Sequence, residues 1–313
     1  MHTHLSSRAR TILGVLSFVL PIIVWSVVSY VPAVWHPQIL ITDPGEVDYF
    51  QAGLRVDRQT FDDELADAKT QGKALPAGVA ANPIYLPAPD RVAKAFYTAF
   101  VTPPETHDGA WLHQSLWHSI QVIFWGFVIS SAVGVPLGVL CGSFAVVARL
   151  NEPFIEFFRY LPAPAFGALA VAILGIYDGP KIAIIVIGTL FQQVLIIANT
   201  TRKLEFALVE AAQTLGTKGV KLLTRVVIPG ILPDLYRDQR ILLGWAWTYL
   251  IVAELIGTTT GITWFITQQA RYQHFPNVYA AIFMIGIIGL GTDLVLAGLG
   301  RRLFPWDRPT AKS

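Results

Sequence analysis

The stretch TRKLEFALVEAAQTLGTKGVKLLTRVVIPGILPD, residues 201–234, is a long polar interruption between two strongly apolar segments. Its apolar residues recur at i, i+4, i+7, i+8 and i+11, and they are Leu204, Leu208, Ala211, Ala212 and Leu215. This spacing places them on one face of a helix. The stretch therefore predicts a short amphipathic helix at a membrane surface.

A turn and a second helical segment are expected after this helix. Gly216 stands where a helix C-cap favours a positive φ. A basic turn follows, with Lys218, Lys221 and Arg225 spaced along it. Prolines cannot donate a backbone hydrogen bond, so Pro229 and Pro233, with Gly230 between them, are expected to break the chain before apolar sequence resumes.

Composition places the chain in a membrane. Of its 313 residues, 53% are hydrophobic and 14% are charged, whereas soluble globular domains carry roughly 25% charged residues. The net charge of +2 gives no strongly basic surface that would indicate nucleic acid as a partner. The single cysteine, Cys141, excludes an internal disulfide framework and a cysteine-based metal site.

Six apolar segments predict an all-α polytopic membrane protein with six transmembrane helices. About 20 apolar residues suffice for a helix to cross a hydrocarbon core of about 30 Å. The segments are residues 11–31, 119–148, 154–176, 182–201, 241–257 and 277–299. The first is too long for a signal peptide and lacks a small-residue cleavage site, so we expect a retained anchor.

Basic residues orient these segments. With the N-terminus in the cytoplasm, fifteen of the 23 lysines and arginines fall on the inner side. Six of the other eight lie in one long loop, where the positive-inside rule is weak. Both termini and the 201–234 stretch are therefore expected in the cytoplasm.

Four regions are expected along the chain. They are a cytoplasmic N-terminus and first span at 1–31, an extracytoplasmic insertion at 32–112, core spans at 113–300 that include the cytoplasmic region 201–234, and a cytoplasmic tail at 301–313. Within the acidic insertion, residues 61–69 predict a helical turn or two, residues 73–83 a loop, and residues 90–100 a short helix that Asp90 can cap. The insertion is expected either to be a lid or docking surface or only to pack on the outer face.

Small residues and prolines give two packing expectations. Gly134, Gly138 and Gly142 recur every four residues, a spacing that lets helix backbones approach closely, either within the chain or between subunits. Three prolines, Pro136, Pro162 and Pro164, fall inside apolar segments. Each removes a backbone hydrogen bond, so each is expected to bend or break its helix.

Polar and aromatic side chains inside the apolar segments are candidates to line a pathway, because uncompensated polar groups are costly in hydrocarbon. They are Thr189, Gln192, Gln193, Trp245, Trp247 and Glu254. Adjacent glutamines point differently, so at most one faces a pathway. Glu254 is expected to be either a functional carboxylate or a helix-end residue bonded to the turn at 258–261. Asp293 is expected to pair with Arg301, Arg302 or a basic residue of the 201–234 region.

The 201–234 stretch also carries an ordered motif: Glu210-Ala211-Ala212, three residues, Gly216, nine residues, and then VVIP at 226–229. It resembles the EAA motif, E-A-A-x3-G-x9-I-x-L-P, of the permease subunits of binding-protein-dependent ABC importers, with valine and isoleucine at the usual Ile and Leu positions. Residues 86–89, 159–162, 245–261 and 304–306 look like the subgroup that imports nitrate, aliphatic sulfonates, taurine or bicarbonate. The similarity covers most of 1–40 and 84–307, and residues 41–82 depart from it as an insertion.

This resemblance implies a type I ABC importer permease fold in a bacterial inner membrane. The implied partners are a second permease copy in a homodimer, a cytoplasmic ABC ATPase dimer bound through residues 204–218, an extracytoplasmic solute-binding protein and membrane lipid. ATP and Mg act in the ATPase, and this chain holds no cofactor. The residues implied in ATPase coupling are Glu210, Ala211, Ala212, Leu215 and Gly216. The implied activity is import of a small anionic solute by alternating access.

Enzymatic classes are disfavoured by what the sequence lacks. It contains no G-x4-G-K-[ST] phosphate loop, no zinc-type spacing among its 7 histidines and no Ser/His/Asp constellation, so neither catalysis nor a metal site is expected. The alternative function is an ion-gradient-driven secondary carrier with Glu254 as its coupling site. Such carriers usually have internal repeats, and no repeat relates the first three segments to the last three. A purely structural subunit would require that the 201–234 region have no ATPase partner.

Overall fold

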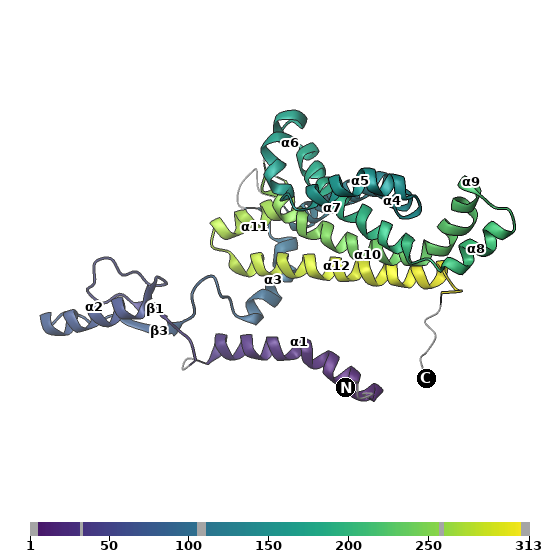
Figure 1. Cartoon of the computed structure of the whole chain (residues 1–313). Coiled ribbons are helices and arrows are strands. Elements are labelled where there is room, and N and C mark those ends of the chain that lie inside the picture. Colours follow the sequence, from purple (N-terminus) through teal and green to yellow (C-terminus); the bar gives the residue numbers. More distant parts are fainter. Residues whose placement is uncertain (1–5, 32–33, 105–110, 257–259, 308–313) are drawn as a thin grey trace. The chain divides into compact units, whose positions relative to one another are not determined.

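A computed structural model of the chain describes residues 6–31, 34–104, 111–256 and 260–307. The chain divides into two compact units, one of residues 1–102 with 268–280 and one of residues 103–267 with 281–313. Figure 1 shows the helices and strands of both units. Most of the described chain is helical, as expected for a polytopic membrane protein.

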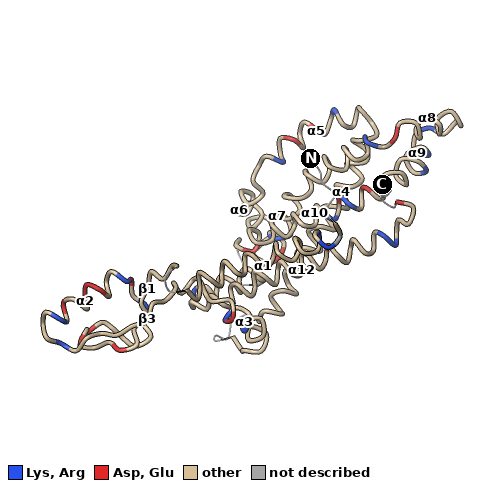
Figure 2. The backbone as a smooth tube through the Cα atoms, turned by 90° about the horizontal axis from the view of Figure 1, so that it is seen from below, with Lys and Arg blue, Asp and Glu red and all other residues tan. Residues whose placement is uncertain are grey.

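The first unit contains a small sheet with a helix on it. Strand β1 (Gln38–Asp43) pairs antiparallel with β2 (Arg55–Asp57) and with β3 (Ala77–Ala81), in the order β2-β1-β3. Helix α2 (Arg58–Gln71) follows β2 directly and carries charges of both signs (Figure 2). Its Phe61 stacks on Phe50 at a centroid distance of 6.1 Å within a core formed with β1.

Three expectations for this region need correction. The sheet departs from the all-α prediction, and β3 occupies part of residues 73–83, which were expected to form a loop. The sequence of β3, AGVAA, has no alternation of apolar and polar residues, and its pairing with β1 supplies the order that its own pattern does not. Helix α2 is also longer than the turn or two predicted at 61–69.

Helices α1 (Ser7–Tyr30) and α3 (Pro89–Val101) complete the amino-terminal part of the first unit. The indole nitrogen of Trp25 donates a hydrogen bond of 3.1 Å to the carbonyl of Pro87, and the Tyr30 hydroxyl donates to the Asp90 carboxylate. These contacts fix the carboxyl end of α1 against the start of α3. Most of the remaining α1 side chains are exposed apolar groups, as suits a helix that faces lipid or another helix.

The second unit is built around α7 (Asp178–Arg202). It packs against α4 (Leu112–Ser143), α5 (Ala145–Arg159), α6 (Gly167–Leu174) and α10 (Ile228–Glu254). Helix α11 (Ile262–Arg271) follows α10, and α12 (Phe275–Leu303) ends the described helices (Figure 1). Two short helices, α8 (Phe206–Thr214) and α9 (Gly219–Leu222), lie between α7 and α10 in sequence.

The glycine repeat brings α4 close to α7. A Cβ atom on Gly142 would lie 2.4 Å from the Thr201 Cβ and 2.7 Å from the Ala198 carbonyl oxygen. A Cβ on Gly138 would lie 2.8 Å from the Ile197 Cβ. Real carbon contacts require about 3.5–4.0 Å, so any larger residue would force the helices apart. The repeat serves packing within the chain, one of the two expected uses.

Four helices of the described chain are long and apolar enough to cross a membrane: Arg8–Tyr30, Leu112–Ser143, Asp178–Arg202 and Phe275–Leu303. The segment expected as the third span is a pair of helices, Ala145–Arg159 and Ala163–Leu174, bent by 88°. Pro162 and Pro164 lie at the bend, as their missing amide hydrogens lead one to expect. Pro136, in contrast, lies inside α4 and does not end it.

The expected break at residues 229–233 is wrong. Helix α9 runs into a π-helical turn, Leu223–Val227, which runs directly into α10. Pro229 lies directly after the π-helical turn, and the chain remains helical there although a proline has no backbone amide hydrogen to donate. Pro233 is accommodated inside the helix, so the chain is helical without interruption from Gly219 to Glu254.

Candidate functional site

The predicted amphipathic helix forms as α8, and none of its residues is buried. The Leu208 side chain is 49% exposed and that of Leu215 is 86% exposed, so most of the apolar face has no covering within the described chain. Glu210 and Ala211 are also exposed, whereas Ala212 is half-buried. This surface is suited to a partner that supplies apolar contacts.

The turn after α8 has the geometry that its glycine predicts. Gly216 has φ +85°, and its amide donates a hydrogen bond of 2.9 Å to the Gln213 carbonyl. The Thr217 amide donates over 3.0 Å to the Ala212 carbonyl, which closes the helix end. Nothing lies within 4 Å of a Cβ built on Gly216, so the requirement for glycine comes from the backbone angle alone.

Basic residues flank this turn on the α9 side. Lys218, Lys221 and Arg225 are all exposed, and Figure 2 shows basic residues gathered at α9. Figure 1 shows α8 and α9 projecting together from one end of the helical bundle. We call the exposed surface of residues 206–225 the α8–α9 surface. It combines apolar contacts, one acidic side chain at Glu210 and several cations.

A buried polar network lies between α4, α7 and α10. Gln193, which has no exposed surface, donates from Nε2 to Ser131 Oγ over 2.8 Å and to Gln239 Oε1 over 2.7 Å. Its Oε1 accepts from Ser130 Oγ over 2.7 Å, and Thr189 Oγ1 lies 2.9 Å from the same hydroxyl. Thr189 and Gln193 therefore bond helices together, which satisfies groups that would be costly unpaired.

The other candidates lie outside that network. Gln192 is half-buried and points away from its neighbour, as adjacent glutamines on a helix must. Trp245 is 42% exposed, while Trp247 lines a cavity of about 370 Å³ between α10 and α12. Arg240 and Asp293 line the same cavity and form an ion pair of 2.9 Å. Asp293 thus pairs with a residue of α10 and not with Arg301, Arg302 or the 201–234 region.

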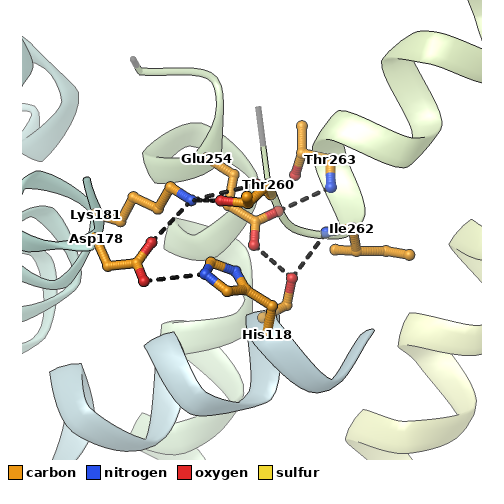
Figure 3. Close-up of polar contacts among 8 residues, drawn as sticks. His118, Asp178, Lys181, Glu254, Thr260, Ile262 and Thr263 are labelled. Carbon is orange, nitrogen blue, oxygen red and sulfur yellow. Dashed lines mark hydrogen bonds and ion pairs between the residues drawn. The ribbon is translucent and has the colours of Figure 1, made fainter. Parts of the chain in front are cut away.

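Glu254 is 2% exposed and caps the start of α11 (Figure 3). Its Oε2 accepts a hydrogen bond of 2.8 Å from the Thr263 amide, and its Oε1 accepts one from the Ser119 hydroxyl. Ser119 Oγ in turn accepts from the Ile262 amide over 2.8 Å. A carboxylate at a helix N-terminus meets unpaired amides and the positive end of the helix dipole. Of the turn expected to bind Glu254, residues 258 and 259 lie outside the described residues.

A buried lysine lies beside this cap. Lys181 has no exposed surface, and its Nζ donates to Thr260 Oγ1 over 2.8 Å and pairs with Asp178 Oδ1 over 3.2 Å. The second carboxylate oxygen of Asp178 lies 3.0 Å from His118 Nε2 (Figure 3). Sequence reasoning missed this chain of contacts because it began the span at residue 182, whereas α7 begins at Asp178. The i, i+3 spacing of Asp178 and Lys181 was the available signal.

These features define a helical membrane protein that is held together by buried polar networks and in which the apolar and basic helix pair α8 and α9 is exposed. The chain belongs to the family described as binding-protein-dependent transport system inner membrane component, whose family model matches residues 134–305. Members of this family are transport components, and the ATPase of such a transporter is a separate partner.

Similar permeases indicate the subgroup of the family to which this chain belongs. The chain is 33% identical to a probable ABC transporter permease of Brucella abortus over 60% of this chain and 76% of that protein. It is 30% identical to the taurine transport system permease of Escherichia coli over 72% and 81% of the two chains. A bicarbonate transport system permease of Synechocystis is 26% identical over 58% and 65%. The chain is thus an ABC permease of the nitrate, sulfonate, taurine and bicarbonate subgroup.

The fold has a solved counterpart. A chain of the MetNI methionine ABC transporter, in an inward-facing conformation, superposes with a TM-score of 0.55 at 18% identity. The match covers 65% of this chain and 100% of that one. This likeness shows a shared permease fold.

Proposed function

We propose that this chain is the transmembrane subunit of an ATP-driven importer that moves a small anionic solute of the nitrate, sulfonate, taurine or bicarbonate type by alternating access. Two copies, each with six spans and both termini in the cytoplasm, surround a central pathway. A separate extracytoplasmic protein delivers the solute, and an ATPase dimer docks on the α8–α9 surface through residues 204–218. Glu210, Ala211, Ala212, Leu215 and Gly216 make that contact.

The observation that carries this proposal is the exposure of α8. A nine-residue helix without a buried side chain gains little from its own chain. Its apolar groups, and the 86% exposed Leu215 that directly follows it, are stabilised when a groove on another protein covers them. The small side chains of Ala211 and Ala212 permit close approach of that groove, and Glu210 can accept hydrogen bonds from it.

The residues predicted to line the pathway form two groups, one inside the buried polar network and one outside it. Thr189 and Gln193 bond helices together, whereas Gln192, Trp245 and Trp247 keep their side chains outside the buried network. We place these last three along the pathway. Trp247 lines the cavity between α10 and α12, which is the part of the bundle interior that a solute could enter.

The secondary-carrier alternative is disfavoured by the surroundings of Glu254. Both carboxylate oxygens accept hydrogen bonds, one from the Thr263 amide and one from Ser119. A backbone amide cannot turn away to release the carboxylate for an ion. The role that fits these contacts is to hold α11 on α10.

The test is co-purification of the chain with its candidate ATPase, followed by an assay of ATP hydrolysis with and without the solute-binding protein. The variant Glu210→Ala combined with Gly216→Pro is expected to insert normally, to lose the ATPase and to lose receptor-stimulated hydrolysis. Glu64→Ala combined with Gly72→Pro makes the same two changes at α2, in the other unit, and is expected to keep the ATPase bound.

Retention of the ATPase and of coupled hydrolysis by the Glu210 and Gly216 variant would refute the docking assignment. Solute movement along an ion gradient without any ATPase would instead favour the carrier, and Glu254→Gln would then be the variant to assay.

A further inference from the structure

The first unit contains a cavity of about 480 Å³ that the importer mechanism does not use. It is lined by Ser29 at the end of α1, by Leu40 of β1, Arg55 of β2 and Val79 of β3, and by Arg91 of α3. All of its lining residues belong to the same compact unit. Its size is within the range of roughly 300–1,000 Å³ that small-molecule sites occupy.

Two guanidinium groups give the cavity its charge. Arg55 is half-buried and its Nη1 donates to the Asn82 carbonyl, while Arg91 is exposed. Among the described residues, neither arginine forms an ion pair. Burial, and then the positive charge of Arg91, lowers the pKa of Arg55 below its usual value. Two guanidinium groups that repel each other are stabilised by an anion bound between them.

The one carboxylate that lines the cavity, among the described residues, is already engaged. Asp90 accepts a hydrogen bond from the Tyr30 hydroxyl, and this bond lowers the pKa of Asp90. It therefore stays ionised and bonded to Tyr30. Arg55 and Arg91 carry two positive charges and Asp90 carries one negative charge, so the lining has a net charge of one positive.

Buried polar atoms without partners also line the cavity. Ser29 is 8% exposed and His36 is 9% exposed, yet within the described ranges neither the Ser29 hydroxyl nor the His36 Nδ1 has a hydrogen-bond partner. Buried polar side chains are nearly always paired, so an unpaired hydroxyl and imidazole nitrogen in one cavity indicate a missing ligand. Both groups can donate a hydrogen bond to an oxygen atom.

We propose that this cavity binds a small oxyanion, a sulfonate, carboxylate or phosphate group, between Arg55 and Arg91, with Ser29 and His36 donating hydrogen bonds to it. Leu40, Val79 and neighbouring apolar residues form the rest of the wall, so the ligand carries a short apolar substituent. The group can come from a free organic anion or from the head of an anionic lipid, because Ser29 lies in the last turn of the apolar helix α1. This site is separate from the ATPase contact and does not depend on it.

The experiment uses the full chain in nanodiscs of zwitterionic phosphatidylcholine, without ATPase or receptor. Binding of radiolabelled ethanesulfonate is measured by equilibrium dialysis. We expect one saturable site, and a loss of affinity of about tenfold or more in Arg91→Gln, because a charge-assisted hydrogen bond is lost. Lys94→Gln removes the same charge from an exposed position on the same helix, outside the cavity, and is expected to leave the affinity unchanged.

Arg55→Gln is expected to act as Arg91→Gln does, but it also removes the bond to Asn82. A melting curve for each variant separates lost binding from lost folding. Within the described ranges Arg91 forms no ion pair, so Arg91→Gln is the deciding variant. A second arm extracts lipid from protein purified in mild detergent from membranes that contain phosphatidylglycerol. Phosphatidylglycerol retained by wild type and Lys94→Gln, but lost from Arg91→Gln, identifies the lipid head as the source of the oxyanion.

Absence of both ligands from the wild type overturns the proposal, as does equal binding by wild type and Arg91→Gln. Because no ATPase is present, neither result bears on the coupling role of α8. Loss of ATPase binding in the Gly216 variants, conversely, leaves this site untouched.

Discussion

Gly216→Ala is expected to weaken the contact with the ATPase by a predictable amount. The residue has φ +85°, and a Cβ there meets no atom within 4 Å, so the substitution changes the backbone preference and introduces no clash. An L-residue in the left-handed region costs roughly 1–2 kcal/mol relative to glycine. The free chain can relax the turn, but a docked chain must keep it. The full cost then appears in binding, as a loss of affinity of about 5- to 30-fold.

Gly72→Ala is the matched control. Gly72 also follows a helix, has φ +67°, and has no atom within 4 Å of a built Cβ, but it ends α2 in the other unit. The two substitutions carry the same local cost. Only the one at Gly216 is expected to change the affinity for the ATPase, measured by biolayer interferometry on the chain in nanodiscs.

A third variant tests whether the positive φ at residue 216 causes the loss of affinity for the ATPase. Asparagine tolerates the left-handed region better than alanine does, so Gly216→Asn is expected to have an affinity between those of wild type and Gly216→Ala. If Gly216→Ala binds the ATPase within about twofold of Gly72→Ala, the turn geometry does not contribute to docking and the reasoning fails.

Three further predictions concern the helical unit. Gly142→Ala is expected to lower the melting temperature, because the new methyl overpacks the contact with α7 at a cost of about 1–3 kcal/mol. Gly291→Ala in α12, where the space is open, is expected to be neutral or stabilising, and equal melting of the two variants would contradict the packing argument. Gly261 has φ +102°, and a Cβ atom there would lie 2.2 Å from the Glu254 carboxylate. Gly261→Ala is therefore expected to speed up amide hydrogen exchange at the start of α11. Unchanged exchange would argue against the cap. Asp178→Asn is expected to lower the melting temperature more than Lys181→Met does. The first change leaves the buried Lys181 ammonium without its counter-ion, whereas the second removes the ammonium itself. The reverse order of melting temperatures would refute this account of the ion pair.

Local signals predicted the turn and the broken segment well. Gly216 has the positive φ that its place after an amphipathic helix indicated, and the chain bends where Pro162 and Pro164 occur. In both cases the backbone chemistry of one residue type decides the geometry, so a single sequence contains the information.

Non-local contacts were beyond the sequence pattern. Strand β3 exists because β1 pairs with it, and the partner of Asp293 proved to be Arg240, 53 residues away in the chain. The buried Lys181 lies just outside the segment predicted at 182–201, because α7 begins earlier, at Asp178. Such pairings depend on which helices lie side by side, which periodicity alone does not specify.

The unbroken α10 connects the α8–α9 surface with the Glu254 cap of α11. It begins beside the α8–α9 surface and ends at Glu254, and its 27 residues span about 40 Å. Leu242, which has no exposed surface, lies near its middle, where a pivot would divide the helix into two nearly equal halves. A tilt of about 10° there moves each end by about 3.5 Å in opposite directions. If α10 moves as a rigid body, a displacement at the π-helical turn Leu223–Val227 would therefore reach the Glu254 cap of α11 about 40 Å away.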